Sequence, residues 1–140
     1  MVIRVVLDTN VILDFLNITR LEHNQAVTLL DVLRRRGVNI CAAATSLKDI
    51  YYILGRSDGK PIAKKAVESV LATMTILPVD FDCCQCASTS TEPDFEDGII
   101  RAAAEIAQTD YLITRDTSVF IGARVPRLSP TDAIRVINHG

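Results

Sequence analysis

The order of hydrophobic and polar positions along the chain predicts strands that alternate with helices. Short, almost unbroken apolar runs are typical of strands buried in a parallel sheet. Such runs occupy residues 2–7, 38–43, 74–79, 110–114 and 125–129. Between them, apolar residues recur every three or four positions, which indicates helices. These helices cover residues 21–35, 61–73 and 82–88, and three more start near residues 46, 94 and 130. We therefore expect an α/β fold, a three-layer sandwich with a central parallel five-stranded sheet.

Local signals support these boundaries. Gly37 follows one predicted helix as a stop, and Pro61 suits the first turn of the next. Pro126 cannot donate a ladder hydrogen bond, which places the last strand at an edge of the sheet. The sequence contains no repeat, low-complexity segment or clear linker, and 49% of its 140 residues are hydrophobic. We expect a single domain over residues 1–140.

Composition and charge exclude some classes of protein. No stretch reaches the roughly 18 apolar residues of a membrane helix. The first apolar run is short, is interrupted by Arg4 and Asp8, and lacks a signal cleavage site, so we expect a cytoplasmic protein without membrane association. The net charge of −2 gives no general attraction to nucleic acids. The one basic run, residues 34–36, lies at a predicted helix end, where it complements the helix dipole or could contact RNA. Few aromatic residues argue against a base-stacking platform.

The four cysteines do not form a recognisable metal motif. Cys83, Cys84 and Cys86 are clustered, whereas Cys41 is isolated in an apolar run. Zinc sites usually combine two such clusters, and here the second is missing. We interpret these residues as reduced thiols packed in a short helix.

Four aspartates mark the candidate site. Asp8 and Asp116 directly follow the first and fourth predicted strands, and the carboxyl ends of parallel strands meet at one edge of a sheet. Asp49 and Asp97 lie in the first turns of helices that begin near the same edge. Four converging carboxylates would repel one another unless a cation joined them. Oxygen ligands of this kind suit Mg²⁺ or Mn²⁺.

Each acid also has a structural explanation. Ser46-x-x-Asp49 and Asp94-x-x-Asp97 both match the capping-box pattern, in which the acid stabilises the start of a helix. Asp94 is assigned to capping alone, and Asp116 could be a turn residue. Asp8 fits such roles poorly, because a cap contributes about 1 kcal/mol, which is small against the cost of burying a carboxylate at the end of an apolar strand.

The sequence resembles the PIN-domain family of metal-dependent nucleases, and within it the branch of VapC-like toxins from toxin–antitoxin pairs. The resemblance covers almost the whole chain. It is carried by Leu7-Asp8-Thr9-Asn10 with Val11-Ile12-Leu13, by Ser46 and Asp49, by Asp94-Phe95-Glu96-Asp97, and by Asp110-Tyr111-Leu112-Ile113-Thr114-Arg115-Asp116 with Phe120.

The resemblance implies a Mg²⁺- or Mn²⁺-dependent endoribonuclease in which Asp8, Asp49, Asp97 and Asp116 form the catalytic set. Asp8, Asp97 and Asp116 would be the metal ligands, and a water activated by the cation would attack the phosphodiester in line. Two positions depart from the family. Asp49 stands where many relatives have glutamate, and Val119 where many have a further acid before the phenylalanine, so the number of bound metals stays open.

Several other residues are candidates for supporting roles. Thr9, Asn10, Ser46 and Thr114 could orient ligands or water, or could serve only the local turns. Arg115 and Arg101 could contact a phosphate or form an ion pair with a neighbouring acid. These two are named as possible phosphate contacts.

Partners and alternative functions follow from the same comparison. The resemblance implies an RNA substrate, a small antitoxin protein and a homodimer, for which residues 21–35 and 46–71 offer apolar surface. One alternative is a Mg²⁺-dependent phosphatase of the haloacid-dehalogenase type. That family needs a second acid two positions after the first, and residue 10 is asparagine. The other alternative is a non-catalytic interaction protein with the same fold.

Overall fold

The computed structural model describes residues 1–140 and contains a five-stranded sheet in which every strand pairs in parallel. Its strands are β1 (Arg4–Leu7), β2 (Asn39–Ala43), β3 (Thr75–Leu77), β4 (Tyr111–Ile113) and β5 (Arg127–Leu128). The order across the sheet is β3-β2-β1-β4-β5. The predicted parallel sheet is therefore confirmed, and β5 lies at an edge as Pro126 indicates.

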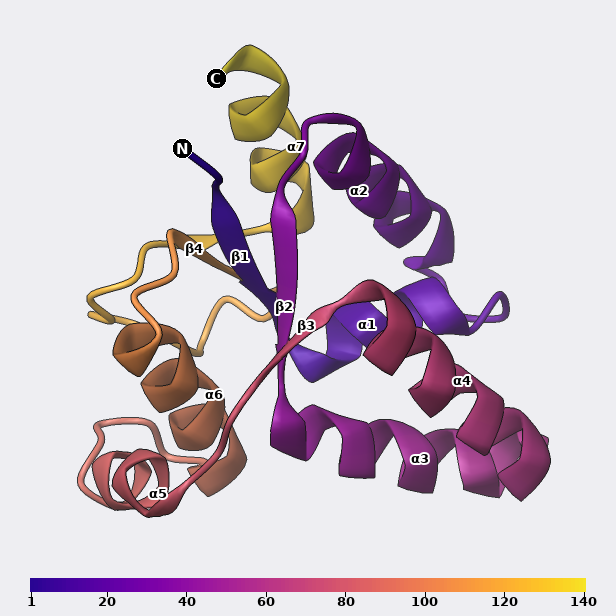
Figure 1. Ribbon diagram of the computed structural model, residues 1–140, viewed down its shortest axis with the longest axis horizontal. Helices are drawn as coiled ribbons and strands as arrows, with labels where there is room; N and C mark the ends of the chain where they lie inside the picture. Colours follow the sequence, from indigo (N-terminus) through magenta and orange to yellow (C-terminus); the bar gives the residue numbers. More distant parts are fainter.

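Seven helices surround the sheet (Figure 1). They are α1 (Thr9–Leu16), α2 (His23–Arg35), α3 (Ala44–Asp58), α4 (Lys60–Thr73), α5 (Phe81–Ser88), α6 (Phe95–Ile106) and α7 (Pro130–His139). Neighbouring helices pack in pairs: α3 with α4, α5 with α6, and α2 with α7.

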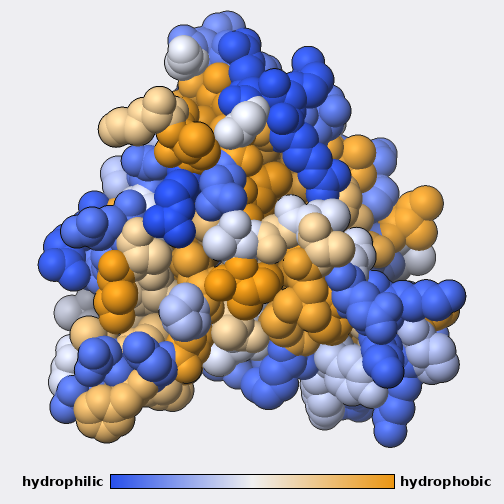
Figure 2. Space-filling view, viewed as in Figure 1, coloured by the Kyte–Doolittle hydropathy of each residue, from blue (hydrophilic) through white to orange (hydrophobic).

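Two hydrophobic cores lie on opposite faces of the sheet, because successive side chains of a strand point to opposite sides. Val5 and Leu7 of β1 belong to the core that α1, α2, α3, α4 and α7 cover. Val6 belongs to the core beneath α5 and α6. The three-layer α/β sandwich expected from the sequence is thus present. Figure 2 shows apolar side chains gathered at the centre of one face, over β2 and β3, with polar side chains around them.

Helix α1 differs from the sequence prediction, which placed no helix after the first strand. It begins directly after Asp8 and buries four consecutive residues, Val11 to Asp14. A helix that is buried on most sides shows no 3.6-residue alternation of apolar and polar positions, so periodicity could not reveal it. As a consequence, Asp8 is the N-cap residue of α1, which corrects the expectation that it fits a capping role poorly.

Helix α3 begins two residues earlier than predicted. Ala43 is its cap residue and forms no side-chain cap, so Ser46 lies inside the helix and Asp49 in its second turn. The capping-box explanation for Ser46 and Asp49 is therefore wrong. The chain passes directly from β2 into α3 without a loop, which moves the helix start back to Ala44.

Helices α5 and α6 approach each other closely where α6 begins. A methyl group at Gly98 would lie 3.2 Å from the carbonyl oxygen of Ala87, so glycine permits this contact. The buried thiol of Cys83 donates to the carbonyl of Ile99 at 3.4 Å. Burial raises the pKa of this thiol to about 11, which keeps it protonated. Both contacts fix the first turn of α6, and with it the residue before Gly98, Asp97.

All four cysteines are free thiols, and Cys83, Cys84 and Cys86 lie in α5, the short helix expected for them. No helix of the structure combines the length and the apolar character needed to cross a membrane.

Candidate active site

The strand order creates a switch point beside β1. The chain runs from β1 outward through β2 and β3, and then crosses to β4 on the other side of β1. Ligands of open parallel sheets bind at the carboxyl ends of the strands where the order reverses in this way. Asp8 follows β1 and Asp116 lies three residues after β4, so both acids lie at this position.

A pocket of about 400 Å³ opens at the switch point. It is lined by all four aspartates of the predicted set, Asp8, Asp49, Asp97 and Asp116, and by two further acids, Asp94 and Glu96. Thr9, Asn10, Tyr52, Ile53 and Ile100 complete the lining. No lysine, arginine or histidine is among these residues. The pocket therefore concentrates negative charge without a basic side chain in its wall.

Asp8 is the most buried of these acids, with 7% of its surface exposed. Its Oδ1 accepts a hydrogen bond of 2.9 Å from the Thr9 backbone N–H, and its Oδ2 accepts one of 2.8 Å from the Thr114 hydroxyl. Burial raises the pKa of Asp8, and the two hydrogen bonds partly offset this effect. The two hydrogen bonds hold the Asp8 carboxylate in one orientation, although burial makes its negative charge unfavourable.

Asp97 is half-buried in the first turn of α6. Its backbone N–H donates to Asp94 Oδ1 at 3.1 Å, so the capping role assigned to Asp94 is present. Burial, followed by the negative charges of Asp8, Asp94, Glu92 and Asp116, raises the pKa of Asp97 to about 6. The raised pKa reflects that every charge acting on Asp97 is negative and none is a positive partner.

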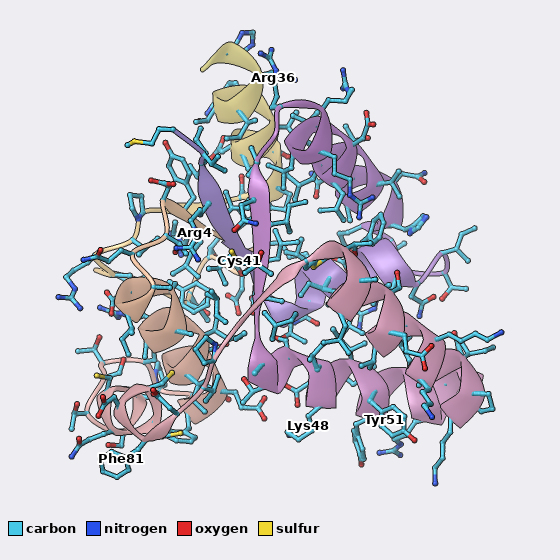
Figure 3. The ribbon with its side chains drawn as sticks, viewed as in Figure 1. Arg4, Arg36, Cys41, Lys48, Tyr51 and Phe81 are labelled. Carbon is cyan, nitrogen blue, oxygen red and sulfur yellow. The ribbon has the colours of Figure 1, made fainter.

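Asp116 and Asp49 are held at the rim by local contacts. Asp116 Oδ1 accepts from the backbone N–H and the hydroxyl of Ser118 at 2.8 and 2.7 Å, which lowers the pKa of Asp116 and shows the turn geometry considered for it. Asp49 Oδ1 accepts from Lys48 Nζ at 3.1 Å. Lys48 projects from α3 away from the sheet (Figure 3) and also lies 3.8 Å from Glu96.

The predicted supporting residues occupy different places. Thr9 and Asn10 line the pocket. The hydroxyl of Ser46 is completely buried and pairs with that of Thr9 at 2.8 Å, which joins α3 to α1 behind the pocket. Thr114 contacts both strand-end acids, because its hydroxyl oxygen also accepts from the Asp116 backbone N–H at 3.1 Å. Val119 is buried in the core beneath α5 and α6 and offers no oxygen to the pocket.

The donor set of the pocket fits a hard divalent cation in its chemistry. All its ionised groups are carboxylates, the ligands that Mg²⁺ and Mn²⁺ prefer. As the side chains stand, no three of them are placed to hold one ion together. The Asp49 and Asp116 carboxylates are bound to Lys48 and Ser118, so a cation would compete with these bonds. The repulsion among the carboxylates, which contributes to the raised pKa of Asp97, favours the binding of a cation.

Asp14 is a buried acid near the site that the sequence interpretation missed. Only 2% of its side chain is exposed, and it forms ion pairs with Arg115 at 2.8 Å and Arg20 at 3.1 Å. Arg115 therefore has the ion pair considered for it, although its partner is 101 residues away in the sequence rather than a neighbouring acid. The one sequence signal for Asp14 is a charged residue inside an apolar run.

Glu92 is a second missed acid. Its Oε2 lies 2.7 Å from Arg101 Nη1, and its Oε1 accepts from the Phe120 backbone N–H at 2.9 Å. Phe120 is buried and has a φ of 60°, a conformation that bulky residues adopt only when their surroundings enforce it. Arg101 also approaches Glu105, so of the two interpretations considered for Arg101 the structure shows the ion pair. Glu92 thus fixes the loop that follows Asp116.

Known proteins share the sequence pattern and the fold of this chain. The family model for the PIN domain matches residues 4–118, most of the chain. The structure of FitAcB from Neisseria gonorrhoeae aligns with a TM-score of 0.71 at 24% identity, over 91% of this chain and 98% of that one. VapC20 from Mycobacterium tuberculosis, described as a toxin that cleaves the sarcin-ricin loop, aligns with a TM-score of 0.66 at 17% identity, over 81% and 90%.

VapBC2 from Rickettsia felis, solved with a DNA fragment from its promoter, aligns with a TM-score of 0.69 at 14% identity, over 91% of this chain and 98% of that one. A search of curated proteins found no match. At these identities the solved structures establish the shared fold. The family model identifies the sequence itself over the segment that carries all four aspartates. The chain therefore belongs to the PIN domain family.

Proposed function

We propose that this protein is a Mg²⁺- or Mn²⁺-dependent endoribonuclease that acts as the toxin of a toxin–antitoxin pair. The observation that carries the proposal is the pocket at the switch point, where six carboxylates meet without a basic side chain and burial raises the pKa of two of them. Such a pocket is unfavourable alone and becomes favourable when a divalent cation binds.

Asp8, Asp97 and Asp116 would hold the cation, and Asp49 would support it from α3. When bound, Mg²⁺ or Mn²⁺ neutralises charge on the phosphate and lowers the pKa of a coordinated water. The chain itself supplies orientation. Thr9 and Thr114 fix both oxygens of Asp8, and the close packing of α5 on α6 fixes the start of the helix that carries Asp97.

The substrate and partner are proposed from the relatives. VapC20 is described as a toxin that cleaves the sarcin-ricin loop and a Klebsiella pneumoniae structure as a toxin–antitoxin complex, while the FitAB and VapBC structures are described as bound to DNA. We extend to this chain an RNA substrate, a small antitoxin protein and a homodimer. Exposed apolar side chains of α3 and α4 offer contact surface for such partners, among them Tyr51, Tyr52, Ile53, Ile62 and Leu71.

The test is cleavage of a labelled RNA by the wild type and by Asp8→Asn, each with Mn²⁺ and with EDTA. Internal cleavage by the wild type with Mn²⁺ alone, and its loss in Asp8→Asn, is the expected result. Asp31→Asn is a matched control, because Asp31 is an exposed aspartate of α2 outside the pocket. Equal cleavage by the wild type and Asp8→Asn would contradict the site assignment.

Two further outcomes separate the alternatives. Hydrolysis of a small phosphomonoester with a trapped aspartyl-phosphate, in place of RNA cleavage, would identify a phosphatase. No hydrolysis of either substrate, together with no effect of Mn²⁺ on the melting temperature, would identify a non-catalytic interaction protein.

A further inference from the structure

We propose that Arg20 and Arg115, both held by the buried carboxylate of Asp14, bind a backbone phosphate of the RNA beside the acidic pocket. The inference rests on the proposed ribonuclease function and adds to it a location for substrate binding. RNA is a polyanion and every ionised group in the pocket wall is acidic, so the pocket alone would repel the substrate. Positive charge must come from residues around the pocket.

Two basic side chains near the pocket are already neutralised, and Arg127, whose charge also reaches Asp116, is bound to the backbone carbonyls of Thr117 and Val119. Lys48 is paired with Asp49 and approaches Glu96, and Arg101 lies between Glu92 and Glu105. In both cases one basic group faces two acids. A phosphate placed there would meet more negative than positive charge.

The cluster around Asp14 has the opposite balance. Asp14 Oδ2 accepts from Arg115 Nε at 2.8 Å, while its Oδ1 accepts from Arg20 Nη1 at 3.1 Å and from Arg115 Nη2 at 3.4 Å. Within ion-pair distance, two guanidinium groups thus share one carboxylate, while Glu22 and Asp8 act on Arg115 only from farther away. Because Asp14 is almost completely buried, its charge requires these partners, and it therefore holds both side chains in place.

Both arginines keep groups free for a ligand. Asp14 engages Nε and Nη2 of Arg115, so Nη1 points away from the ion pair. The side chains of Arg20 and Arg115 are 25% and 36% exposed, so solvent reaches both. A guanidinium held in a fixed plane, with free N–H groups, is the kind of donor that recognises phosphate.

The cluster lies directly beside the pocket. Arg20 Nη1 is 3.4 Å from Oδ1 of Asn10, which lines the pocket. Arg115 lies in the sequence between Thr114, which binds Asp8, and Asp116. A phosphate on these arginines would therefore belong to a nucleotide close to the bond at the acids.

The test measures binding rather than cleavage. A fluorescein-labelled single-stranded RNA is titrated with the Asp8→Asn protein, which the proposed function predicts to be inactive, and anisotropy is followed over a range of salt concentrations. In this background we compare Arg20→Gln, Arg115→Gln and the double variant. Glutamine retains the capacity to donate a hydrogen bond to Asp14 but removes the charge.

We expect about tenfold weaker RNA binding for the double variant, since it loses a charge-assisted hydrogen bond. The slope of log K against log salt should fall by about 0.7, the effect of one lost phosphate contact on a single strand. Arg35→Gln is the matched control, because Arg35 is also an exposed arginine paired with an aspartate. It lies at the end of α2, before β2 begins and thus at the opposite edge of the sheet, and should change neither quantity.

Different results would contradict the inference and the proposed function. If the double variant binds RNA with the affinity and salt slope of Arg35→Gln, the cluster is a structural ion network only. If Arg115→Gln does not fold, the decision rests on Arg20→Gln and on Arg20→Lys with Arg115→Lys. The lysine pair keeps the charges and should keep the salt slope. If neither the wild type nor the Asp8→Asn protein binds RNA at all, the proposed function itself fails and the inference with it.

Discussion

Thr114, which directly follows the neighbouring strand β4, donates a 2.8 Å hydrogen bond to Oδ2 of Asp8. The same hydroxyl oxygen accepts from the Asp116 backbone N–H, so one buried side chain connects both strand-end acids. We expect Thr114→Val, which keeps the shape and removes the hydroxyl, to lower RNA cleavage about 10- to 100-fold, as for other residues that orient metal ligands. A quenched fluorescent RNA provides the measurement.

Thr114→Ser is the control for this variant, because serine keeps the hydroxyl and loses only a methyl group. It should retain most of the activity. Loss of activity in the serine variant with retention in the valine variant would show that packing of the methyl group matters and the hydrogen bond does not.

The raised pKa of Asp97 predicts that the stability of the protein depends on pH. The pKa of this group is about 6 in the folded protein and 3.8 in the unfolded chain. The folded state therefore holds this proton more firmly, and the resulting stabilisation is complete below pH 3.8 and is lost as the pH rises through about 6. In EDTA, we expect Asp97→Asn to melt several degrees above the wild type at pH 8, where the wild type carries the buried charge.

At pH 4 the melting temperatures of Asp97→Asn and the wild type should converge, because the Asp97 carboxyl of the folded wild type is then protonated and, like the asparagine side chain, uncharged. Asp31→Asn, an exposed substitution in α2, should show no such change with pH. A constant difference between Asp97→Asn and the wild type from pH 4 to pH 8 would refute the electrostatic explanation.

Glu92 predicts a stability effect away from the pocket. Its carboxylate is 3% exposed and binds both Arg101 and the backbone of Phe120. Glu92→Ala leaves the buried N–H of Phe120 without its acceptor and removes the nearer of the two carboxylates that face Arg101, and we expect a loss of about 2 kcal/mol in the free energy of unfolding. Urea unfolding measures it. Glu68→Ala, at an exposed position of α4, should change stability by less than about 0.5 kcal/mol.

The sheet and most helices follow from the sequence because their apolar residues fall into separate, regularly spaced groups. The observed strands are shorter than the apolar runs. Val2, for example, belongs to the first apolar run but precedes β1 and is exposed. Helix α1 could not be predicted from periodicity, because its residues Val11 to Asp14 are all buried and show no alternation of apolar and polar positions.

The four aspartates could be brought together from the sequence because parallel strands place their carboxyl ends at one edge. The contacts that hold the aspartates in place could not be predicted from the sequence. Asp14 and Arg115 are 101 residues apart and Glu92 and Phe120 are 28 apart, and neither pair has a motif. Such pairs are fixed by the way the elements pack, which local patterns do not encode.

Asp49 stands at the position where many PIN relatives carry glutamate, and substitution can test its role there. Its carboxylate lies on the pocket wall and is bound by Lys48. If Asp49 supports the cation, Asp49→Glu should retain activity within about threefold of the wild type, and Asp49→Ala should lose about tenfold in Mn²⁺-dependent RNA cleavage. Full activity of Asp49→Ala would assign Asp49 to the ion pair with Lys48 alone.

The carboxylates of the switch-point pocket are expected to bind a divalent cation, and a calorimetric titration with Mn²⁺ tests this most directly. Wild type and Asp31→Asn should bind Mn²⁺ with the same affinity. Asp8→Asn should bind it at least tenfold more weakly, because it removes the charge of the most buried acid in the pocket. Equal Mn²⁺ affinity in Asp8→Asn and the wild type, or no binding by either, would contradict this expectation.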